Sequence, residues 1–560
     1  MKYTVFYYLV FGVLLTSCEF DPNPIQDQTT EELWSNAAYG EGILTNAYGN
    51  LNASYPVSMD YLTDNAVPSA VGANQIALGG WTVENSSLGD WTNSYNMIKY
   101  LNLYIKNGKN LLYSVSDKVK NDILRKNRMG EAYYLRAWYQ SQLLQVYAGK
   151  PQNGSQVLGF PIVVKALEVG DDLDLPRNTY EECAIQIAKD CDSASAVLPV
   201  MYNQGSDPYY GLKNRGRASG LAAKALKARV FLNAASPAYG DSSQALWERA
   251  AKAAYEAIQL SGGLVNLAPY NNFNDAASFD NIWIQPTYED SNMEYQYYPP
   301  SLYGLGQCNP SQNLVNEFPS KNGYPIDNNN ANYNPLKPYE NRDDRLTNFI
   351  FYNGDSYNDT TIKTFVGGDD APGGLSQRGT RTGYYMKKLL SKKVKLNPGN
   401  QSNDIKFYVY LSKTELYLNF AEAANEAYGP DNAILGYSAK DVMKKIRMRA
   451  GIDSDPSSTT YEDQYLDSQA LVGKLAFRNF IQSNRRIELC FEGFRFWDIR
   501  RWNMPLNHTI QGVVINTSNS GYTYSYVPVE NHTFQSYMQY APLPYTQTLI
   551  MNNLKQNAGW

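Results

Sequence analysis

The segment from Trp81 to Asn96 combines aromatic rings with amides and hydroxyls and shows no helical or strand periodicity. Neutral sugars present apolar C–H faces and rings of hydroxyl groups, so their sites need flat aromatic surfaces beside groups that exchange hydrogen bonds. Trp81, Trp91 and Asn96 offer both within one expected loop. The segment therefore predicts a sugar-contacting loop, with packing of the two indoles against the first helices as the competing interpretation.

Residues for catalysis or metal binding are scarce. The chain has only two histidines, His508 and His532, so imidazole chemistry has little material. A glycoside hydrolase needs two carboxylates held about 5 to 9.5 Å apart, and no recognisable acid/base motif supplies them. Asp369 and Asp370 lie in a Gly-rich stretch and are expected to be solvated. The sequence thus predicts a protein that is not an enzyme and that holds no cofactor or metal.

The amino terminus has the pattern of a secretory signal. An apolar run from Val5 to Leu15 follows Lys2 and ends in Leu-Thr-Ser before Cys18. A membrane span needs about 20 apolar residues, so this run is too short to be one. We predict a signal peptide over residues 1–17 and acylation of Cys18, which anchors the mature chain to a membrane. The alternative is a secreted protein in which Cys18 is incidental.

Composition describes a folded protein, with 43% hydrophobic and 18% charged residues. A net charge of −5 gives no general attraction to phosphate backbones, so nucleic acid is not an expected partner. Cys183 and Cys191 lie in one expected helix, whose rise separates them by about 12 Å, beyond the ~7 Å reach of a disulfide. Together with Cys308 and Cys490 they are expected to be free, buried thiols.

Apolar residues recur at steps of three and four in several segments, which predicts helices. These segments are 131–147, 218–235, 247–260, 414–428, 439–450 and 471–491. Many alanines on their apolar faces favour close helix pairs of the tetratricopeptide-like kind. We therefore expect a mainly α fold, in which a helix-pair scaffold carries a loop-rich, mixed second lobe with short strands.

The expected organisation follows the same changes in pattern. Between the helical blocks the chain is rich in Asn, Gly, Pro and Tyr, which is typical of long functional or irregular stretches. The expected parts are the signal peptide (1–17), the anchor and linker (18–40), a helical part (41–261), the loop-rich lobe (262–404), the continued helical part (405–503) and an irregular carboxyl-terminal segment (504–560).

The segment from Arg485 to Trp502 reads RRIELCFEGFRFWDIRRW. The spacing places Arg485 and Glu488, Arg495 and Asp498, and Asp498 and Arg501 at i, i+3, which predicts ion pairs on helix surfaces. The aromatic residues of the segment are expected to be packing residues. A basic binding patch is the alternative, but acids alternate with the bases and largely cancel their field.

This segment is similar to the RRxELxFEGxRxWDLRRW signature of the SusD/RagB family. Further pieces resemble the family in the same order along the chain, from residue 18 to the end. They are GEAYYLRA (130–137), GRA (216–218), NRDDR (341–345), AEAANE (421–426) and QNAGW (556–560).

The resemblance implies a lipid-anchored protein on the cell surface of the outer membrane. Such proteins sit as a lid over a SusC-like TonB-dependent transporter and deliver ligand to it without catalysis. The expected ligand is an oligosaccharide or polysaccharide. The RagB branch binds peptides instead.

The resemblance also directs attention to particular residues. Starch-binding members carry a platform Trp followed five residues later by a ligand-contacting Asn, and Trp91 with Asn96 has that spacing. Asp64 lies in a segment that resembles the border of the same pocket. A second aromatic source follows the helix pairs, where we expect Trp283 and Tyr298 to contact ligand among the aromatic residues between 283 and 303.

Three functions therefore compete: a glycan-binding transporter lid, the same lid serving oligopeptides, and a surface glycoside hydrolase. The absence of an acid/base motif disfavours the hydrolase. Peptides would call for charged or backbone-pairing groups rather than aromatic platforms, so the segment from Trp81 to Asn96 favours sugar.

Overall fold

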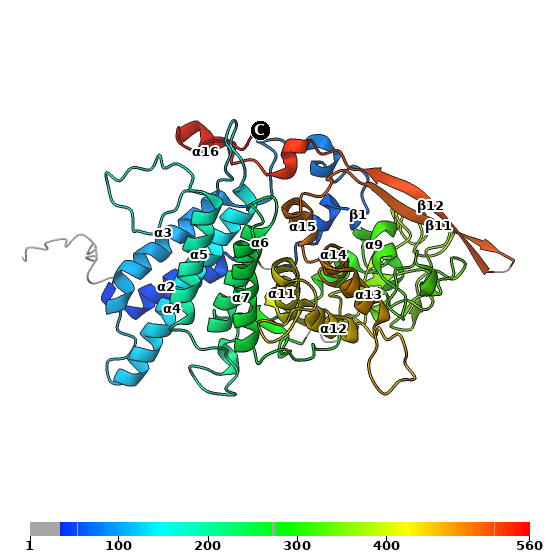
Figure 1. Cartoon of the computed structure of the whole chain (residues 1–560), viewed down its shortest axis with the longest axis horizontal. Helices are drawn as coiled ribbons and strands as arrows, with labels where there is room; N and C mark the ends of the chain where they lie inside the picture. The colour runs from blue at the N-terminus through cyan, green and yellow to red at the C-terminus, as the bar shows by residue number, and fades with distance from the viewer. Residues whose placement is uncertain (1–33, 53, 271–274, 520) are drawn as a thin grey trace, which may run out of the picture.

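The computed structural model describes residues 34–52, 54–270, 275–519 and 521–560; the expected signal peptide and Cys18 lie outside these ranges. Long helices form one half of the molecule, and short helices, short strands and loops form the other (Figure 1). The expected mainly α class, with a helical scaffold and a loop-rich second lobe, is confirmed.

The first helical block brings successive helices together in neighbouring pairs (Figure 1). Side-chain caps start several of them: Asp117 accepts from the Lys120 amide at the start of α4, and Thr179 and Glu182 form a capping box at the start of α5. The block consists of α2 (Ala37–Gly49), α3 (Trp91–Asn107), α4 (Lys118–Tyr147), α5 (Tyr180–Ser195), α6 (Gly220–Ala235) and α7 (Gln244–Leu260).

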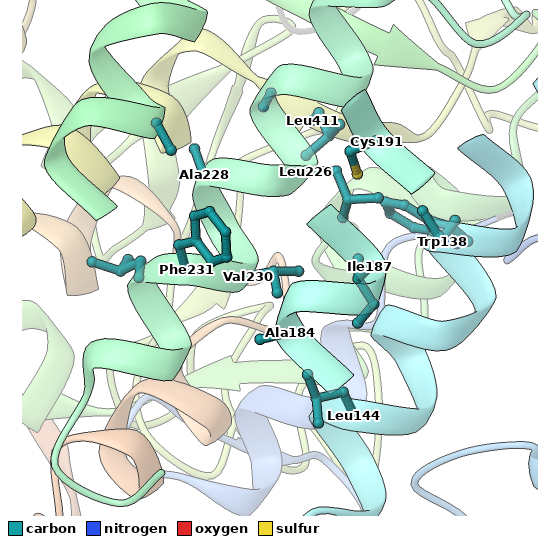
Figure 2. Close-up of a cluster of buried hydrophobic side chains, with 14 of the residues drawn as sticks. Trp138, Leu144, Ala184, Ile187, Cys191, Leu226, Ala228, Val230, Phe231 and Leu411 are labelled. Atoms are coloured by element: carbon teal, nitrogen blue, oxygen red, sulfur yellow. The ribbon is translucent and has the colours of Figure 1, made fainter. Parts of the chain in front are cut away.

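Small residues let these helices approach closely. Figure 2 shows Leu226, Val230 and Phe231 of α6 in one buried cluster with Ala184 and Ile187 of α5. Alanine has no side chain beyond Cβ, so helix backbones can pack at the short end of the usual 8–10 Å separation. The Ala-rich sequence of α6 is therefore what allows it to be packed between α5 and α7.

The second helical block continues the same core. Helix α11 is buried almost throughout and packs against α7, α12 and α14. The single helix expected over 471–491 is instead two, because Gly473 has φ of 112° and separates α13 from α14. The block consists of α11 (Lys413–Tyr428), α12 (Ala439–Arg449), α13 (Gln464–Val472), α14 (Lys474–Glu488) and α15 (Arg495–Arg501).

The second lobe is built on short antiparallel strand pairs around a core of its own, which includes Phe318, Phe349 and Tyr385. Within the described ranges every sheet has two strands. The pairs are β1 (Ala66–Pro68) with β4 (Cys308–Pro310), β2 (Asn281–Ile284) with β10 (Val409–Ser412), β3 (Tyr288–Asp290) with β9 (Asp404–Lys406), β5 (Ile350–Phe351) with β8 (Tyr385–Met386), and β6 (Ser356–Tyr357) with β7 (Thr360–Thr361). Of these, the β2–β10 pair lies at the junction of the lobes, where it packs on α6 and α11 and belongs to the first core. Short helices connect them: η1 (Val57–Leu62), α8 (Asn292–Tyr297), α9 (Gln312–Glu317) and α10 (Asp344–Phe349).

The carboxyl-terminal part contains a longer hairpin than the sequence indicates. Strands β11 (Thr509–Ser518) and β12 (Gly521–Asn531) pair along their whole length and extend to the edge of the molecule (Figure 1). Val513 and Ile515 of β11 are buried against the second core, which fixes the ribbon on this lobe. A short helix, α16 (Tyr545–Ile550), follows.

Cys183, Cys191, Cys308 and Cys490 are free and buried, as expected. Burial raises the pKa of the Cys183 thiol to about 12 and holds these sulfurs in their unreactive protonated form. Of the helices in the described part of the chain, none is long and apolar enough to cross a membrane.

Asp498 is the centre of a buried ion network. Its carboxylate accepts hydrogen bonds from Arg485 Nε at 2.9 Å and from Arg501 Nε at 2.8 Å. Arg501 also binds both oxygens of Glu422 on α11, at 2.5 and 2.6 Å. Burial alone would raise the pKa of Asp498, but the two guanidinium groups hold it below its usual range. The network thus ties α14 and α15 to the helical scaffold.

Glu488 plays the same part toward the second lobe. It binds Arg345 Nη1 at 3.1 Å and Arg449 Nη2 at 2.6 Å, and it accepts a hydrogen bond from the Tyr270 hydroxyl at 2.6 Å. All of these side chains are buried. Glu488 thus links α14 to α10, to α12 and to the loop after α7.

The expectation of surface i, i+3 pairs in this signature segment is therefore wrong. Asp498 and Arg501 do pair, but Arg485 does not bind Glu488, and Arg495 does not bind Asp498. Arg485 on α14 binds Asp498 on α15, and Arg495 binds Asp64 before β1, because burial of the segment between both cores favours pairing across elements.

We expect Asp498→Ala to destabilise the protein strongly, because Arg485 and Arg501 then lose a buried partner. Breaking a buried pair by removing one side costs about 3–5 kcal/mol. Thermal unfolding should show a large fall in Tm. Glu340→Ala is the control, since Lys337 and Glu340 form an exposed pair with side chains 59% and 61% exposed. Equal Tm values for the two variants would contradict the role given to Asp498.

Candidate functional site

The segment expected to be a loop from Trp81 to Asn96 becomes a helix at Trp91. The Asp90 carboxylate accepts from the Asn93 amide at 2.9 Å and caps α3, which starts at Trp91. Residues five apart on a helix point about 140° away from each other. Asn96 is exposed, whereas Trp91 is only 5% exposed and packs against Tyr147 at 5.2 Å between ring centroids. The structure therefore does not bring Trp91 and Asn96 together, and the expectation of an exposed Trp91 ring is wrong.

Trp81 is also a packing residue. Its ring is 2% exposed and meets Trp560 at 4.9 Å, while its Nε1 donates to Ser86 Oγ at 3.1 Å. Trp81 therefore holds the carboxyl terminus against the scaffold and offers no face to a ligand.

Asp64 is buried in ion pairs rather than available to ligand. Arg495 binds both its carboxylate oxygens, at 2.9 and 3.0 Å, and Arg486 Nη2 lies 3.0 Å from Oδ2. Burial alone would raise the pKa of Asp64, but these two guanidinium groups hold it far below its usual range. Asp64 thus joins the signature segment to the chain just before β1.

Trp283 and Tyr298 are each 1% exposed, so the structure contradicts their choice as ligand-contacting rings. The Tyr298 hydroxyl donates to the Ser391 carbonyl at 2.6 Å inside the second core. The same stretch does carry exposed aromatic rings, at Tyr295 (50%) and Tyr303 (51%). The segment was correctly recognised as aromatic, but burial could not be assigned within it because no periodicity marks its faces.

A pocket of about 440 Å³ lies between the two lobes, where the end of α4 meets the turn that leads into α15. We call it the inter-lobe pocket. Residues 87–94 form one of its edges, so the segment singled out in the sequence does border it, although Trp81, Trp91 and Asn96 do not line it. Its aromatic lining consists of Trp138, Tyr139, Tyr147, Tyr408, Tyr410, Phe494 and Trp497.

Helix α4 presents one mixed face to the inter-lobe pocket. Trp138, Gln142 and Gln145 are separated by four and three residues, so they lie on the same side of the helix. Among the residues that the structure describes, the side-chain amides of Gln142, Gln145 and Asn93 have no hydrogen-bond partner. Each amide can therefore donate and accept hydrogen bonds with a ligand.

Trp497 is a half-buried ring on the opposite wall, at the start of α15. It packs edge to face against buried Phe496 at 4.9 Å, which fixes its orientation. Its indole N–H has no acceptor in the described part of the chain, whereas the nearby Trp502 Nε1 donates to Glu422 at 2.7 Å. Trp497, Tyr408 and Phe494 are thus the half-buried rings of the pocket lining, whereas its other rings are buried.

Glycine permits the close approach that forms this wall. Gly493 has φ of 81°, and a Cβ added there would lie 2.5 Å from Pro56 Cγ. A larger residue would push the turn before α15 away from η1.

Two of the three charged residues that line the inter-lobe pocket form ion pairs within the protein, and the third, exposed Asp90, accepts a hydrogen bond from the Asn93 amide. Arg229 binds both oxygens of Glu415 at 2.6 Å, and Glu492 accepts from Lys388 Nζ at 2.5 Å. Burial alone would lower the pKa of Arg229, but the Glu415 carboxylate raises it, so that this pKa lies above its usual range. The guanidinium group also lies 5.7 Å from the Trp138 ring and 5.6 Å from that of Phe494. Such a pocket suits a neutral ligand.

The buried tryptophans form a second layer behind this pocket. Trp283 contacts Tyr410 at 4.3 Å and Trp138 at 4.9 Å, and its Nε1 donates to the Gly216 carbonyl at 3.0 Å. Trp91 supports Tyr147 in the same way. Two of the rings expected to touch ligand therefore fix the rings that line the pocket.

Sequence reasoning missed Gln142, Gln145, Tyr408 and Trp497. Gln142 and Gln145 lie in the last turns of α4, where Gln140 and Ser141 are also polar but buried, so residue type alone did not distinguish them. No feature of the sequence marked Trp497 as a residue that borders a pocket, because the signature segment around it is rich in packing residues. In the described part of the chain, no group of three His, Cys, Asp or Glu is arranged to hold a metal ion.

We expect Trp91→Ala to lower stability rather than to remove a ligand contact. Truncating a buried Trp costs about 3–5 kcal/mol, because it leaves a cavity beside Tyr147. Thermal unfolding should show a lower Tm. Asn96→Ala, an exposed change five residues further along α3, should leave Tm unchanged. An unaltered Tm for Trp91→Ala would contradict the observed packing.

Similar solved structures share this fold over nearly their whole length. A SusD-like protein from Bacteroides fragilis is 21% identical, with 96% of this chain and 99% of that chain covered at a TM-score of 0.73. A SusD-like carbohydrate binding protein from the same species is 20% identical, with 93% and 99% covered at 0.69. Surface glycan-binding protein A from Bacteroides fluxus is 18% identical, with 94% and 100% covered at 0.59. No curated protein sequence matches the chain.

Two family models match the sequence. A model described as "Starch-binding associating with outer membrane" matches residues 28–232. The model of the SusD family matches residues 271–560, which is more than half of the chain and contains the signature segment. The protein therefore belongs to the SusD family.

Proposed function

We propose that this protein is a non-catalytic glycan-binding lipoprotein of the outer cell surface, which captures oligosaccharides or polysaccharides and delivers them to a SusC-like TonB-dependent transporter. The observation that carries the proposal is the inter-lobe pocket. It combines the half-buried rings of Tyr408, Phe494 and Trp497 with side-chain amides that have no partner in the described part of the chain, those of Asn93, Gln142 and Gln145.

This combination matches the chemistry of a neutral sugar. The C–H face of a pyranose can stack on an indole or phenol ring, and its hydroxyls can exchange hydrogen bonds with amides. A pocket of about 440 Å³ lies within the usual range of small-ligand sites. Arg229 and Glu492 already have charged protein partners, and Asp90 is engaged as the cap of α3, which favours a ligand without charge.

Relatives support the same class of ligand. Their printed descriptions name carbohydrate binding, glycan binding at the surface and starch binding in association with the outer membrane. The present chain shares their fold and, over its carboxyl-terminal half, the SusD family model.

The carboxylates at the inter-lobe pocket favour binding over catalysis. Asp90 caps α3 through its bond to the Asn93 amide, and Glu492 is paired with Lys388. Glycoside hydrolysis needs one carboxylic acid and one carboxylate, both directed at the scissile bond. Here the carboxylates of Asp90 and Glu492 are already engaged in a helix cap and an ion pair.

Isothermal titration of the chain lacking residues 1–18 against a polysaccharide panel and a tryptic digest of casein tests the proposal. We expect a neutral glycan to bind, and Trp497→Ala to weaken it by roughly 1–4 kcal/mol, which is about fivefold or more, because a stacking surface is lost. Asn96→Ala, outside the pocket, should bind as the wild type does. Peptide binding without glycan binding would overturn the proposal in favour of an oligopeptide lid. Unchanged glycan affinity in Trp497→Ala would show that the glycan binds outside the inter-lobe pocket.

The prediction of a lipid anchor rests on the Leu-Thr-Ser-Cys sequence at residues 15–18, and the prediction of delivery to a transporter rests on the family. Cys18→Ala should release the protein from outer membranes, because two or three acyl chains are needed for stable attachment. Detergent extracts of the wild type should also yield a SusC-like barrel bound to this chain. Membrane retention of Cys18→Ala without lipid by mass spectrometry, or repeated recovery of the chain alone, would contradict these two points respectively.

A further inference from the structure

A second pocket, of about 570 Å³, lies in the other half of the molecule. It is enclosed by α9, α13, α14 and the turn at residues 319–327, and we call it the α13–α14 pocket. In Figure 1 these helices lie well away from α3 and α4. No residue lines both pockets, so a ligand here would be independent of the inter-lobe pocket.

The α13–α14 pocket has an aromatic wall. Half-buried Tyr465 packs against Tyr324 at 5.3 Å and against buried Phe480 at 5.9 Å. The Arg447 guanidinium supports Phe480 from 4.9 Å, and it is itself bound to Asp463 at 3.0 Å and to the Gly323 carbonyl at 2.8 Å. These bonds hold the wall in place before any ligand arrives.

Polar groups line the remaining sides. Asn479 projects from the same face of α14 as Ala476 and Ser483, and its amide has no partner among the described residues. Asn316 accepts from Gln312 Nε2 at 2.7 Å, which leaves its own N–H groups available. Asp327 is exposed and forms no ion pair within the described ranges. Donors and acceptors therefore border the Tyr465 ring, as hydroxyl-rich ligands require.

The larger cavity elsewhere does not offer this combination. A hollow of about 760 Å³ beside the first half of α4 is bordered by Val197, Leu198, Val200 and Met201, with Tyr210 as its aromatic residue. Within the described ranges, its one aromatic lining residue, Tyr210, has a ring contact only with its chain neighbour Tyr209, at 6.3 Å between ring centroids, and the charged Asp122 and Lys126 also line the cavity.

We infer that the α13–α14 pocket is a second binding site for neutral glycan, with Tyr465 as the stacking ring and Asn479 and Asn316 as hydrogen-bonding groups. This inference rests on the proposed function, since it extends glycan binding to a second place on the same chain. Two sites on one protein raise the affinity for a polysaccharide that reaches both, because the second contact is intramolecular. A short oligosaccharide gains no such advantage.

The test uses titration calorimetry with maltohexaose, cellohexaose and xylohexaose, and with soluble starch, mixed-linkage β-glucan and xylan as the matching polymers. We expect the wild type to bind two molecules of the recognised hexasaccharide. Tyr465→Ala and Trp497→Ala should each bind one, and the double variant none. Asn479→Ala, an exposed change that spares the fold, should weaken one of the two sites about fivefold or more. Affinity for the polymer should fall by about tenfold or more in Tyr465→Ala.

Three outcomes separate this inference from the proposed function. The first is a single site in the wild type, which Trp497→Ala removes and which neither Tyr465→Ala nor Asn479→Ala affects. That result overturns the second site and leaves the proposed function standing. One site that is lost in Tyr465→Ala, with Tm unchanged, supports the α13–α14 pocket and overturns the inter-lobe pocket. Binding of no glycan by the wild type overturns both.

Discussion

The structure depends on charges that are buried and must be paired. Three carboxylates, Asp64, Asp498 and Glu488, each hold two arginines, and these arginines come from α10, α12, α14 and α15. An unpaired charge in the interior is far more costly than a missing apolar contact, so the helices must dock in an arrangement that places each of these three carboxylates beside its arginines. Because Asp64 lies before β1 and Glu422 on α11, the network joins both lobes.

Aromatic residues in this protein work in two layers. The front layer, which includes Tyr147 and Tyr410, borders the inter-lobe pocket, and the back layer, which includes Trp91 and Trp283, fixes it; Phe496 supports Trp497 in the same way. A ring that is packed on its far side loses little conformational freedom when a sugar stacks on its near side, so the binding surface is largely formed in advance. Tyr465 stands in the same relation to Phe480 and Arg447. This repeated construction is why the two pockets can be considered for one class of ligand.

The two pockets differ in what encloses them. The inter-lobe pocket combines the scaffold with the turn before α15, and its edge includes the loop before α3. The α13–α14 pocket belongs to the later helices and the second lobe. A long glycan could therefore be held by parts of the protein that share no lining residue, which suits capture of polymers at a cell surface. Arg229 and Glu492 at the inter-lobe pocket form ion pairs within the protein. At the α13–α14 pocket, the exposed Asp327 forms no ion pair within the described ranges.

The sequence by itself determined the helical scaffold, the loop-rich lobe, the free thiols and the family, because these follow from local periodicity, spacing and a long motif. Asp90 is a favoured N-cap residue and so marks the start of α3 in the sequence, but the segment after it lacks the apolar periodicity that would predict a helix there. Only the tertiary structure decided which rings are reachable. Trp283 and Tyr298 cannot be told from Tyr295 by type or position, since all lie in a stretch without regular faces. The partners of Arg485 and Arg495 were likewise hidden, because the nearest charge in sequence is not the nearest in space once the segment is buried between two cores.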